Sequence, residues 1–147
     1  MRVVVFADGL VGFQILDFLI RNFKEDIRAV VVMGEGRISA AAARAQLPVI
    51  TFSDYSRLLE ELPEAFDYGV LAWWPRILPE SVIAQAERGF LNTHPSYLPW
   101  NRGKNYNFWA LVEGTPFGVT LHMVDKGIDT GAIVAQKIID YDWTDSG

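Results

Sequence analysis

Three polar side chains in the second half of this sequence are of types that catalyse acyl transfer. Asn92 and His94 are two residues apart, and Asp129 follows well downstream. Asn92 and His94 come directly after the apolar run Gly89–Leu91, which is typical of the end of a buried strand. Because residues i and i+2 of a strand point to the same face, both side chains can line one pocket. Pro95 then ends the strand.

An amide, an imidazole and a carboxylate together suit acyl transfer to an amine. A neutral imidazole can accept the proton that the attacking amine loses. An Asn side chain can donate a hydrogen bond to the oxyanion that forms. The carboxylate can orient the protonated imidazole or hold a water molecule that relays a proton. Since an amine can attack directly, this chemistry needs no Ser or Cys nucleophile.

Two motifs around these residues resemble those of the formyltransferases that use 10-formyltetrahydrofolate. They are Asn92-x-His94-Pro95-Ser96-x-Leu98-Pro99 and Asp125-x-Gly127-x-Asp129-x-Gly131. Members of this family formylate glycinamide ribonucleotide, methionyl-tRNA or amino sugars carried on nucleotides. The stretch between residues 101 and 119 most resembles the sugar N-formyltransferases. The resemblance implies that Asn92, His94 and Asp129 are catalytic and that 10-formyltetrahydrofolate is the cosubstrate.

Length and composition narrow the class of protein. A chain of 147 residues, about half of them apolar, is long enough for one domain with a substantial core. Its net charge of −5 is unlike that of nucleic-acid-binding surfaces, which weakens the case for a transfer-RNA substrate. The absence of cysteine excludes disulfides and zinc–thiolate sites and fits a cytoplasmic protein. The apolar runs are too short for a signal peptide or a membrane span.

Strand and helix patterns alternate along the first 90 residues. We expect strands at 3–6, 27–33, 48–52 and 68–73, and helices at 11–23, 39–46, 55–62 and 79–87, with Ser39 and Ser53 as caps. Continuous β-branched runs such as Val3–Phe6 are typical of strands buried on both faces of a parallel sheet. The alternation predicts an α/β, doubly wound, mostly parallel Rossmann-like sheet with flanking helices.

The last third of the chain predicts a different pattern. We expect a helix at 105–112 with Phe108, Trp109 and Val112 directed inward, then strands at 117–124 and 132–139. These two strands and the Asp/Gly-rich loop between them predict a C-terminal antiparallel hairpin. The segment 140–147 reads as acidic and irregular.

The turn after the first predicted strand holds Gly9 and Gly12. A strand, a Gly-x-x-Gly and a helix suggest a dinucleotide site, but the full Gly-x-Gly-x-x-Gly is absent. We favour the interpretation that these glycines permit a tight turn. Glycinamide ribonucleotide formyltransferases carry a phosphate loop richer in Gly, Ser and Asn here. Asp8 would repel a phosphate, which counts against that substrate.

The segment Trp73–Pro79 follows the fourth predicted strand. Ligands of open α/β sheets bind at such carboxyl ends. The family places its folate pocket against this loop, so the resemblance implies that Arg76, Ile77 and Leu78 contact the folate. By the same resemblance Asp125 and Asp129 line that pocket. The alternative is a rigid aromatic loop that packs on the core.

A loop rich in Pro, Trp, Asn and Gly follows His94. Within it Tyr97 and Trp100 can stack on a base or a sugar. Arg102 and Lys104 can bind a diphosphate or the glutamate tail of the folate. The alternative is that these two charges are simply solvated.

His122 shares a face with Thr120 on the strand expected at 117–124. We favour a supporting role for His122 beside Asp129 over a direct catalytic one, because one base suffices. A metal site formed by His94, His122, Asp125 and Asp129 is conceivable from their side-chain types. No recognised metal motif is present, so we expect no metal.

These observations predict one catalytic domain over residues 1–147 that transfers a formyl group from 10-formyltetrahydrofolate to a primary amine. We expect the amine of a nucleotide-linked amino sugar. The alternatives are methionyl-tRNA or glycinamide ribonucleotide formylation, and a truncated folate- or nucleotide-binding module without turnover. Family members continue further, so we expect the family's C-terminal portion to be lacking, a portion that can carry homodimer contacts.

Overall fold

Seven strands lie in the order β3-β2-β1-β4-β5-β6-β7 in one sheet. Their bounds are β1 Val3–Ala7, β2 Ile27–Val32, β3 Val49–Thr51, β4 Tyr68–Ala72, β5 Phe90–His94, β6 Gly118–Met123 and β7 Ile133–Ile138. β1 pairs in parallel with β2 and β4, and β2 pairs in parallel with β3. The pairs β5/β6 and β6/β7 are antiparallel. The predicted fold class is therefore confirmed, and antiparallel pairing starts one strand earlier than expected.

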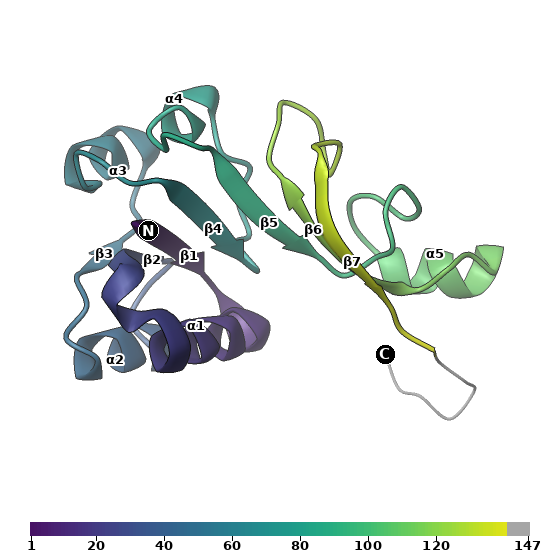
Figure 1. The fold of residues 1–147 in the computed structure, drawn as a ribbon, viewed down its shortest axis with the longest axis horizontal. Coiled ribbons are helices and arrows are strands. Elements are labelled where there is room, and N and C mark those ends of the chain that lie inside the picture. Colours follow the sequence, from purple (N-terminus) through teal and green to yellow (C-terminus); the bar gives the residue numbers. More distant parts are fainter. Residues whose placement is uncertain (141–147) are drawn as a thin grey trace. The chain divides into compact units, whose positions relative to one another are not determined.

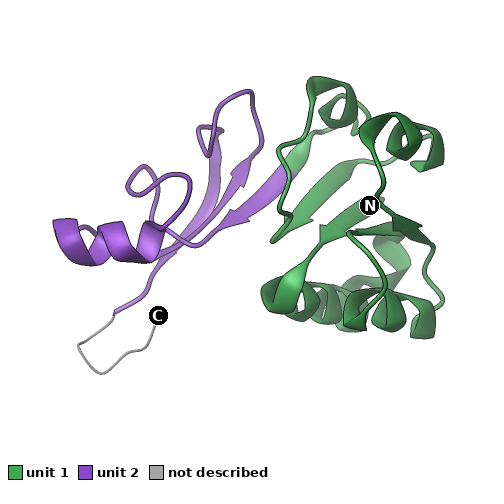
Figure 2. Cartoon of the chain, turned by 180° about the vertical axis from the view of Figure 1, so that it is seen from behind, with its two compact units in different colours: residues 1–90 green, residues 91–147 purple. Residues whose placement is uncertain are grey.

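This computed structural model describes residues 1–140, so the prediction for 140–147 falls almost wholly outside the described residues. The chain divides into two compact units, Met1–Phe90 and Leu91–Gly147 (Figure 2). In the first unit the helices α1 (Gly9–Phe23) and α2 (Arg37–Arg44) cover one face of the parallel strands (Figure 1). The helices α3 (Tyr55–Glu61) and α4 (Glu80–Ile83) cover the other. A 3₁₀ turn, η1 (Lys24–Asp26), follows α1, and α5 (Tyr106–Glu113) belongs to the second unit.

The core of the first unit explains why the β1 sequence is apolar throughout. Val3, Val5 and Ala7 pack with residues of α1 and α2 in one buried cluster. Phe6 belongs to the opposite face, where its ring meets those of Trp74 and Phe90 edge-on at 5.4 Å. Because both faces of β1 are covered, no position in it accommodates a polar residue.

Gly12 lets α1 approach the sheet closely. A Cβ added at this position would lie 2.5 Å from the carbonyl oxygen of Ala72 in β4. The neighbouring atom belongs to the backbone and cannot rotate away, so only glycine fits. The reason for this glycine is therefore close packing of the helix on the sheet, and not the tight turn expected from the sequence.

Several helix ends differ from the sequence expectations. α1 begins two residues early, and α4 ends at Ile83, well before residue 87. Ser39 lies inside α2, where its hydroxyl accepts the N–H of Gly36 at 2.9 Å. Asp54, and not Ser53, caps α3, because its Oδ1 accepts the N–H of Arg57 at 3.0 Å.

The inward aromatic face predicted for α5 is wrong. Phe108, Trp109 and Val112 are 57%, 45% and 60% exposed, and Ala110 is the one buried residue of this helix. Ala110 therefore lies on the covered side of the helix, while Phe108, Trp109 and Val112 face outward.

Candidate active site

Two antiparallel strands of the second unit bring four polar residues into two opposed pairs. In the β5/β6 register Asn92 lies opposite His122, and His94 lies opposite Thr120. Asn92 and His94 share a face because they are two residues apart on β5. Thr120 and His122 share a face of β6 for the same reason, and both are buried. The predicted juxtaposition of Asn92 and His94 is thus present.

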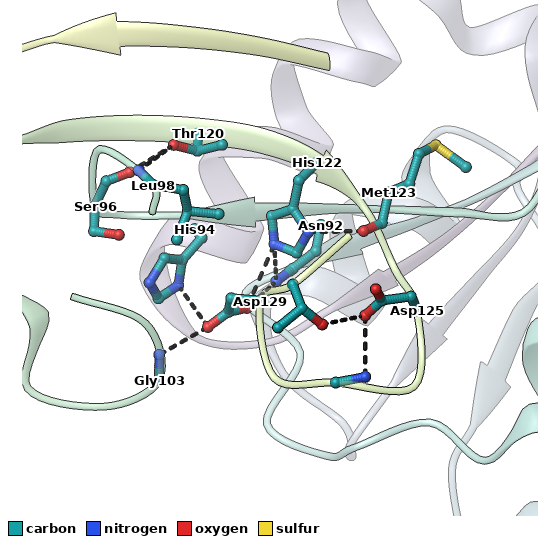
Figure 3. Close-up of polar contacts among 12 residues, drawn as sticks. Asn92, His94, Ser96, Leu98, Gly103, Thr120, His122, Met123, Asp125 and Asp129 are labelled. Carbon is teal, nitrogen blue, oxygen red and sulfur yellow. Dashed lines mark hydrogen bonds and ion pairs between the residues drawn. The ribbon is translucent and has the colours of Figure 1, made fainter. Parts of the chain in front are cut away.

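Asp129 is the centre of the cluster (Figure 3). Its Oδ1 accepts from the amide of Asn92 at 3.3 Å and lies 3.4 Å from Nε2 of His122. Its Oδ2 accepts the backbone N–H of Gly103 at 2.9 Å and lies 3.4 Å from Nδ1 of His94. The carboxylate therefore joins the two catalytic candidates on β5 to His122 on β6.

His122 is oriented by its second ring nitrogen. Its Nδ1 donates to the carbonyl of Met123 at 2.8 Å, so Nε2 is the nitrogen that faces Asp129 and, at 3.3 Å, the amide of Asn92. Burial alone lowers the pKa of His122. The Asp129 carboxylate and the Met123 carbonyl outweigh burial and leave this pKa raised above its ordinary value.

The same contacts keep Asp129 ionised. Burial alone raises the pKa of this carboxyl group. Hydrogen bonds from His122 and from the Gly103 N–H, with the charges of both imidazoles, outweigh that cost and leave the pKa lowered. Together the two shifts favour an imidazolium at His122 beside a carboxylate at Asp129.

His94 has oxygen acceptors at both ring nitrogens. Nε2 donates to the backbone carbonyl of Asn101 at 3.0 Å, and Nδ1 faces Asp129. The ring also meets the edge of Tyr106, with centroids 5.5 Å apart. A neutral imidazole can donate to only one of the two acceptors. The contacts at both ring nitrogens therefore fix the position of the His94 ring.

Sequence reasoning missed the backbone groups of this cluster. The Gly103 N–H and the Asn101 carbonyl contact Asp129 and His94 directly, yet no side-chain type identifies such groups in advance. The only signal was their place in the motif between residues 101 and 104. The contact of Tyr106 with His94 was also missed, because the helix face was assigned incorrectly.

The loop that carries Asp129 is stabilised by its own turn. Oδ1 of Asp125 accepts the N–H of Gly127 at 3.0 Å and the hydroxyl of Thr130 at 2.6 Å, and these bonds lower the pKa of Asp125. A Cβ at Gly131 would lie 1.8 Å from the carbonyl oxygen of Met123. This glycine therefore lets the loop backbone pack closely against Met123.

The predicted substrate-binding residues lie on the loop that follows His94. The rings of Tyr97 and Trp100 stack on each other at 6.1 Å with 24° between their planes, and Trp100 is 42% exposed. Arg102 and Lys104 are exposed and make no hydrogen bond or ion pair with any residue in 1–140. They flank Gly103, whose N–H contacts Asp129.

The predicted folate-contacting loop belongs to the first unit. Arg76 is exposed, Ile77 is 82% exposed, and Leu78 is buried in the core. The carbonyl of Ile77 accepts the hydroxyl of Tyr55 at 2.6 Å, which holds the loop in place. An exposed apolar side chain beside an exposed cation fits a flat heterocycle that bears carboxylates. Leu78 would contact such a ligand only through its backbone, because its side chain is buried.

A depression of about 670 Å³ lies at the carboxyl ends of β1 and β2. Its charged lining residues are Asp8, Glu35 and Arg37, and the side chain of Asp8 does not cap α1. Two carboxylates against one guanidinium make this depression a poor host for a phosphate.

The described part of the chain spans residues 1–140. Within that range no group of three or more His, Cys, Asp or Glu side chains has an arrangement that could hold a metal ion. Over the same range no helix combines the length and the apolar character needed to cross a bilayer.

Comparison with known proteins now bears on this cluster. The family described as formyl transferase matches residues 1–146. The chain belongs to the formyl transferase family. Among curated relatives, it is 30% identical to a methionyl-tRNA formyltransferase of Roseiflexus sp. (strain RS-1), over 95% of this chain and 47% of that protein. A second methionyl-tRNA formyltransferase, from Roseiflexus castenholzii, is 33% identical over 95% of this chain and 49% of its own length. The chain thus spans about half the length of the curated relatives it matches.

Solved structures of the family share the fold. Glycinamide ribonucleotide transformylase 1 of Geobacillus kaustophilus superposes with a TM-score of 0.79 at 28% identity, over 99% of this chain and 85% of that one. A Mycobacterium tuberculosis protein thought to be a sugar N-formyltransferase gives a TM-score of 0.71 at 22% identity, over 96% and 55%. The second likeness concerns the fold alone.

Proposed function

We propose that this protein transfers the formyl group of 10-formyltetrahydrofolate to a primary amine. The observation that carries the proposal is the partly buried cluster in which Asp129 contacts Asn92, His94 and His122 within 3.4 Å. Such a cluster combines hydrogen-bond donors for a developing oxyanion with groups that accept a proton. Membership of the formyl transferase family supports the same chemistry.

The folate supplies an activated formyl group, and the residues of this chain handle charge and protons. Asn92 is the donor to the formyl oxygen as negative charge develops there. When His122 is an imidazolium, its Nε2–H turns to Asp129 and no longer accepts from Asn92. One amide hydrogen of Asn92 is then free for the oxyanion.

His94 accepts the proton that the amine loses as it attacks the formyl carbon, and the Asp129 carboxylate beside it stabilises the imidazolium that forms. The new bond joins the amine nitrogen to that carbon, and the bond from carbon to the folate nitrogen breaks. The proton returns to the folate nitrogen as it leaves, which balances the reaction as a formamide and tetrahydrofolate. Asp129 stays in place throughout because the Gly103 N–H holds its second oxygen.

We propose a nucleotide-linked amino sugar as the amine substrate. The stacked pair Tyr97 and Trp100 offers an exposed aromatic surface for a base or a sugar, and the free cations Arg102 and Lys104 suit a diphosphate. The carboxylates of Asp8 and Glu35 in the depression of the first unit disfavour a phosphate there. They count against glycinamide ribonucleotide.

Methionyl-tRNA is the second candidate substrate. It is favoured by the names of the curated relatives, which are methionyl-tRNA formyltransferases. The net charge of −5 opposes it, because a transfer-RNA partner usually meets a basic surface.

The test is a spectrophotometric assay of tetrahydrofolate release from 10-formyltetrahydrofolate. The acceptors are a thymidine-diphosphate 3-amino or 4-amino sugar, methionyl-tRNA and glycinamide ribonucleotide, each supplied alone. His94→Ala is the loss-of-function variant, and Arg44→Ala, an exposed change on α2, is its matched control. Release that needs the amino sugar and His94 supports the proposal, and release with methionyl-tRNA alone selects the second candidate.

A binding measurement completes the test. If no acceptor elicits release, saturable binding of a folate analogue would assign the chain to a binding module without turnover. If the protein neither releases tetrahydrofolate nor binds the folate analogue, the proposed function is refuted.

A further inference from the structure

A row of three polar side chains crosses the strands of the second unit. The strand registers place His94 of β5 opposite Thr120 of β6, and Thr120 opposite Gln136 of β7. Thr120 is only 1% exposed. Burying a hydroxyl group costs free energy unless it forms hydrogen bonds. The hydrogen-bond partners of Thr120 therefore indicate its structural role.

Every hydrogen-bonding site of the Thr120 hydroxyl is occupied. It donates to the carbonyl of Ser96 at 2.7 Å and accepts the N–H of Leu98 at 3.1 Å and the amide of Gln136 at 3.0 Å. The amide of Gln136 also donates to the carbonyl of Leu98 at 2.7 Å. The two side chains therefore hydrogen-bond to the backbone on either side of Tyr97, at Ser96 and Leu98 (Figure 3 shows Ser96, Leu98 and Thr120).

The loop that begins with this segment also contacts the His94 ring. Ser96 Oγ donates to the carbonyl of Trp100 at 2.9 Å, which closes the loop. The next carbonyl, that of Asn101, accepts from Nε2 of His94 at 3.0 Å. The amide of Asn101 is itself held by the hydroxyl of Thr115 at 2.8 Å. The position of the His94 ring thus depends on the course of the loop from 95 to 101.

We propose that Thr120 and Gln136 are positioning residues for His94. They hold the loop so that the Asn101 carbonyl keeps the proton on Nε2 and directs Nδ1 at Asp129. Both side chains bond to the backbone of Ser96 and Leu98, and the ring bonds to the Asn101 carbonyl, so their effect on His94 passes through the loop backbone. The inference rests on the proposed formyl transfer for its kinetic consequence, but its structural consequence is independent of any activity.

Thr120→Val is the principal test, because valine keeps the shape and removes the hydroxyl. We expect kcat for formyl transfer to fall about ten-fold to a hundred-fold with little change in KM, as a misplaced catalytic group costs rate more than binding. Thr120→Ser keeps the hydroxyl and should restore most of kcat. Val30→Ala, a core change in the first unit, is the matched control for lost stability and should leave kcat unaffected at a temperature where it is folded.

Nuclear magnetic resonance of the His94 ring nitrogens tests the same inference without turnover. In the wild type the signals should report a proton held on Nε2, and in Thr120→Val they should shift toward a mixture of tautomers. Gln136→Leu removes two of the bonds at a half-buried position and gives a second variant if Thr120→Val fails to fold.

The outcomes separate cleanly. If the wild type lacks formyl transfer but Thr120→Val still shifts the tautomers of His94, the proposed function is refuted and the positioning role is kept. Unchanged ring signals in both variants, or a Thr120→Ser variant as impaired as Thr120→Val, would overturn the positioning role.

Discussion

Asp129, more than His94, is the residue on which the candidate site is built. Its carboxylate meets two imidazoles, one amide and one backbone N–H, which come from β5, β6 and the loop at 103. A group with that many partners orients each of them relative to the others. Replacing it therefore disturbs His94, His122 and Asn92 together.

Asp129→Asn should lower kcat by about 10²-fold to 10⁴-fold, the range for loss of a group that moves protons or supports an oxyanion donor. The amide keeps the size of the side chain but loses its charge, and its single oxygen can accept from only one of the two imidazoles. The tetrahydrofolate-release assay measures this loss. Asp140→Asn, an exposed change in the same unit, is the control. Equal rates for the two variants would contradict the assigned role.

His122 should make stability depend on pH. Because its pKa is raised in the folded state, its contribution is fully present below about pH 6.5, the ordinary pKa of histidine, and is lost as pH rises through the raised value. The lowered pKa of Asp129 acts in the opposite sense and matters only in acid, so pH 5.5 to 9 isolates the histidine. The melting temperature of the wild type relative to His122→Gln should fall over this range. A difference that grows toward pH 9 would refute the pairing.

Among the elements, the short strands β5 and β6 determine which residues meet in the candidate site. Their alternation assigns Asn92, His94, Thr120 and His122 to defined faces, and their antiparallel register sets which pairs meet. A shift of one residue would turn each pair to the opposite face. The buried Thr120 hydroxyl helps to hold this register, because it bonds to the backbone of Ser96 and Leu98 just after β5.

At the level of helix packing, Gly12→Ala should lower the free energy of unfolding by about 1–3 kcal/mol, the usual cost of forcing an extra methyl group into a packed contact. The added methyl group would meet the Ala72 carbonyl and push α1 away from β4. Chemical denaturation measures the effect. Gly34→Ala is the matched control, because nothing lies within 4 Å of its added Cβ. Similar stabilities for the two variants would show that α1 adjusts freely.

Over the whole molecule, the candidate residues are divided between the two units. Asn92, His94, His122 and Asp129 all come from the second unit, while Arg76, Ile77 and Leu78 come from the first. The four candidate residues of the cluster thus all lie within residues 91–140, and the residues predicted to contact the folate lie in the first unit.

The net charge of −5 predicts weak binding of transfer RNA by the whole chain. Counterion release at phosphates drives such binding, and it requires lysine and arginine in excess. At physiological salt the dissociation constant should be weaker than about 100 µM, the upper end of non-specific affinities. Electrophoretic mobility shift measures it. Micromolar binding that Arg102→Ala with Lys104→Ala abolishes would contradict this prediction and favour the methionyl-tRNA candidate.

Local sequence determined much of this protein. Runs of β-branched residues and their spacing from helical stretches indicated the α/β fold, since both follow from short-range periodicity. The spacing of Asn92 and His94 placed them on one face, and the motifs carried the family resemblance. Periodicity also showed which residues of α5 share a face, but it cannot show which face is covered, and there the expectation failed.

Only the tertiary structure decided how the site is assembled. The register of β5 on β6, the contacts of Asp129, and the backbone groups of Gly103 and Asn101 all join residues distant in sequence. Backbone donors and acceptors are nearly the same at every position, so the residue type does not indicate which of them will contact a side chain. Which backbone group contacts a side chain depends on packing across the whole unit. The same packing places the Thr120 hydroxyl against the loop that positions His94.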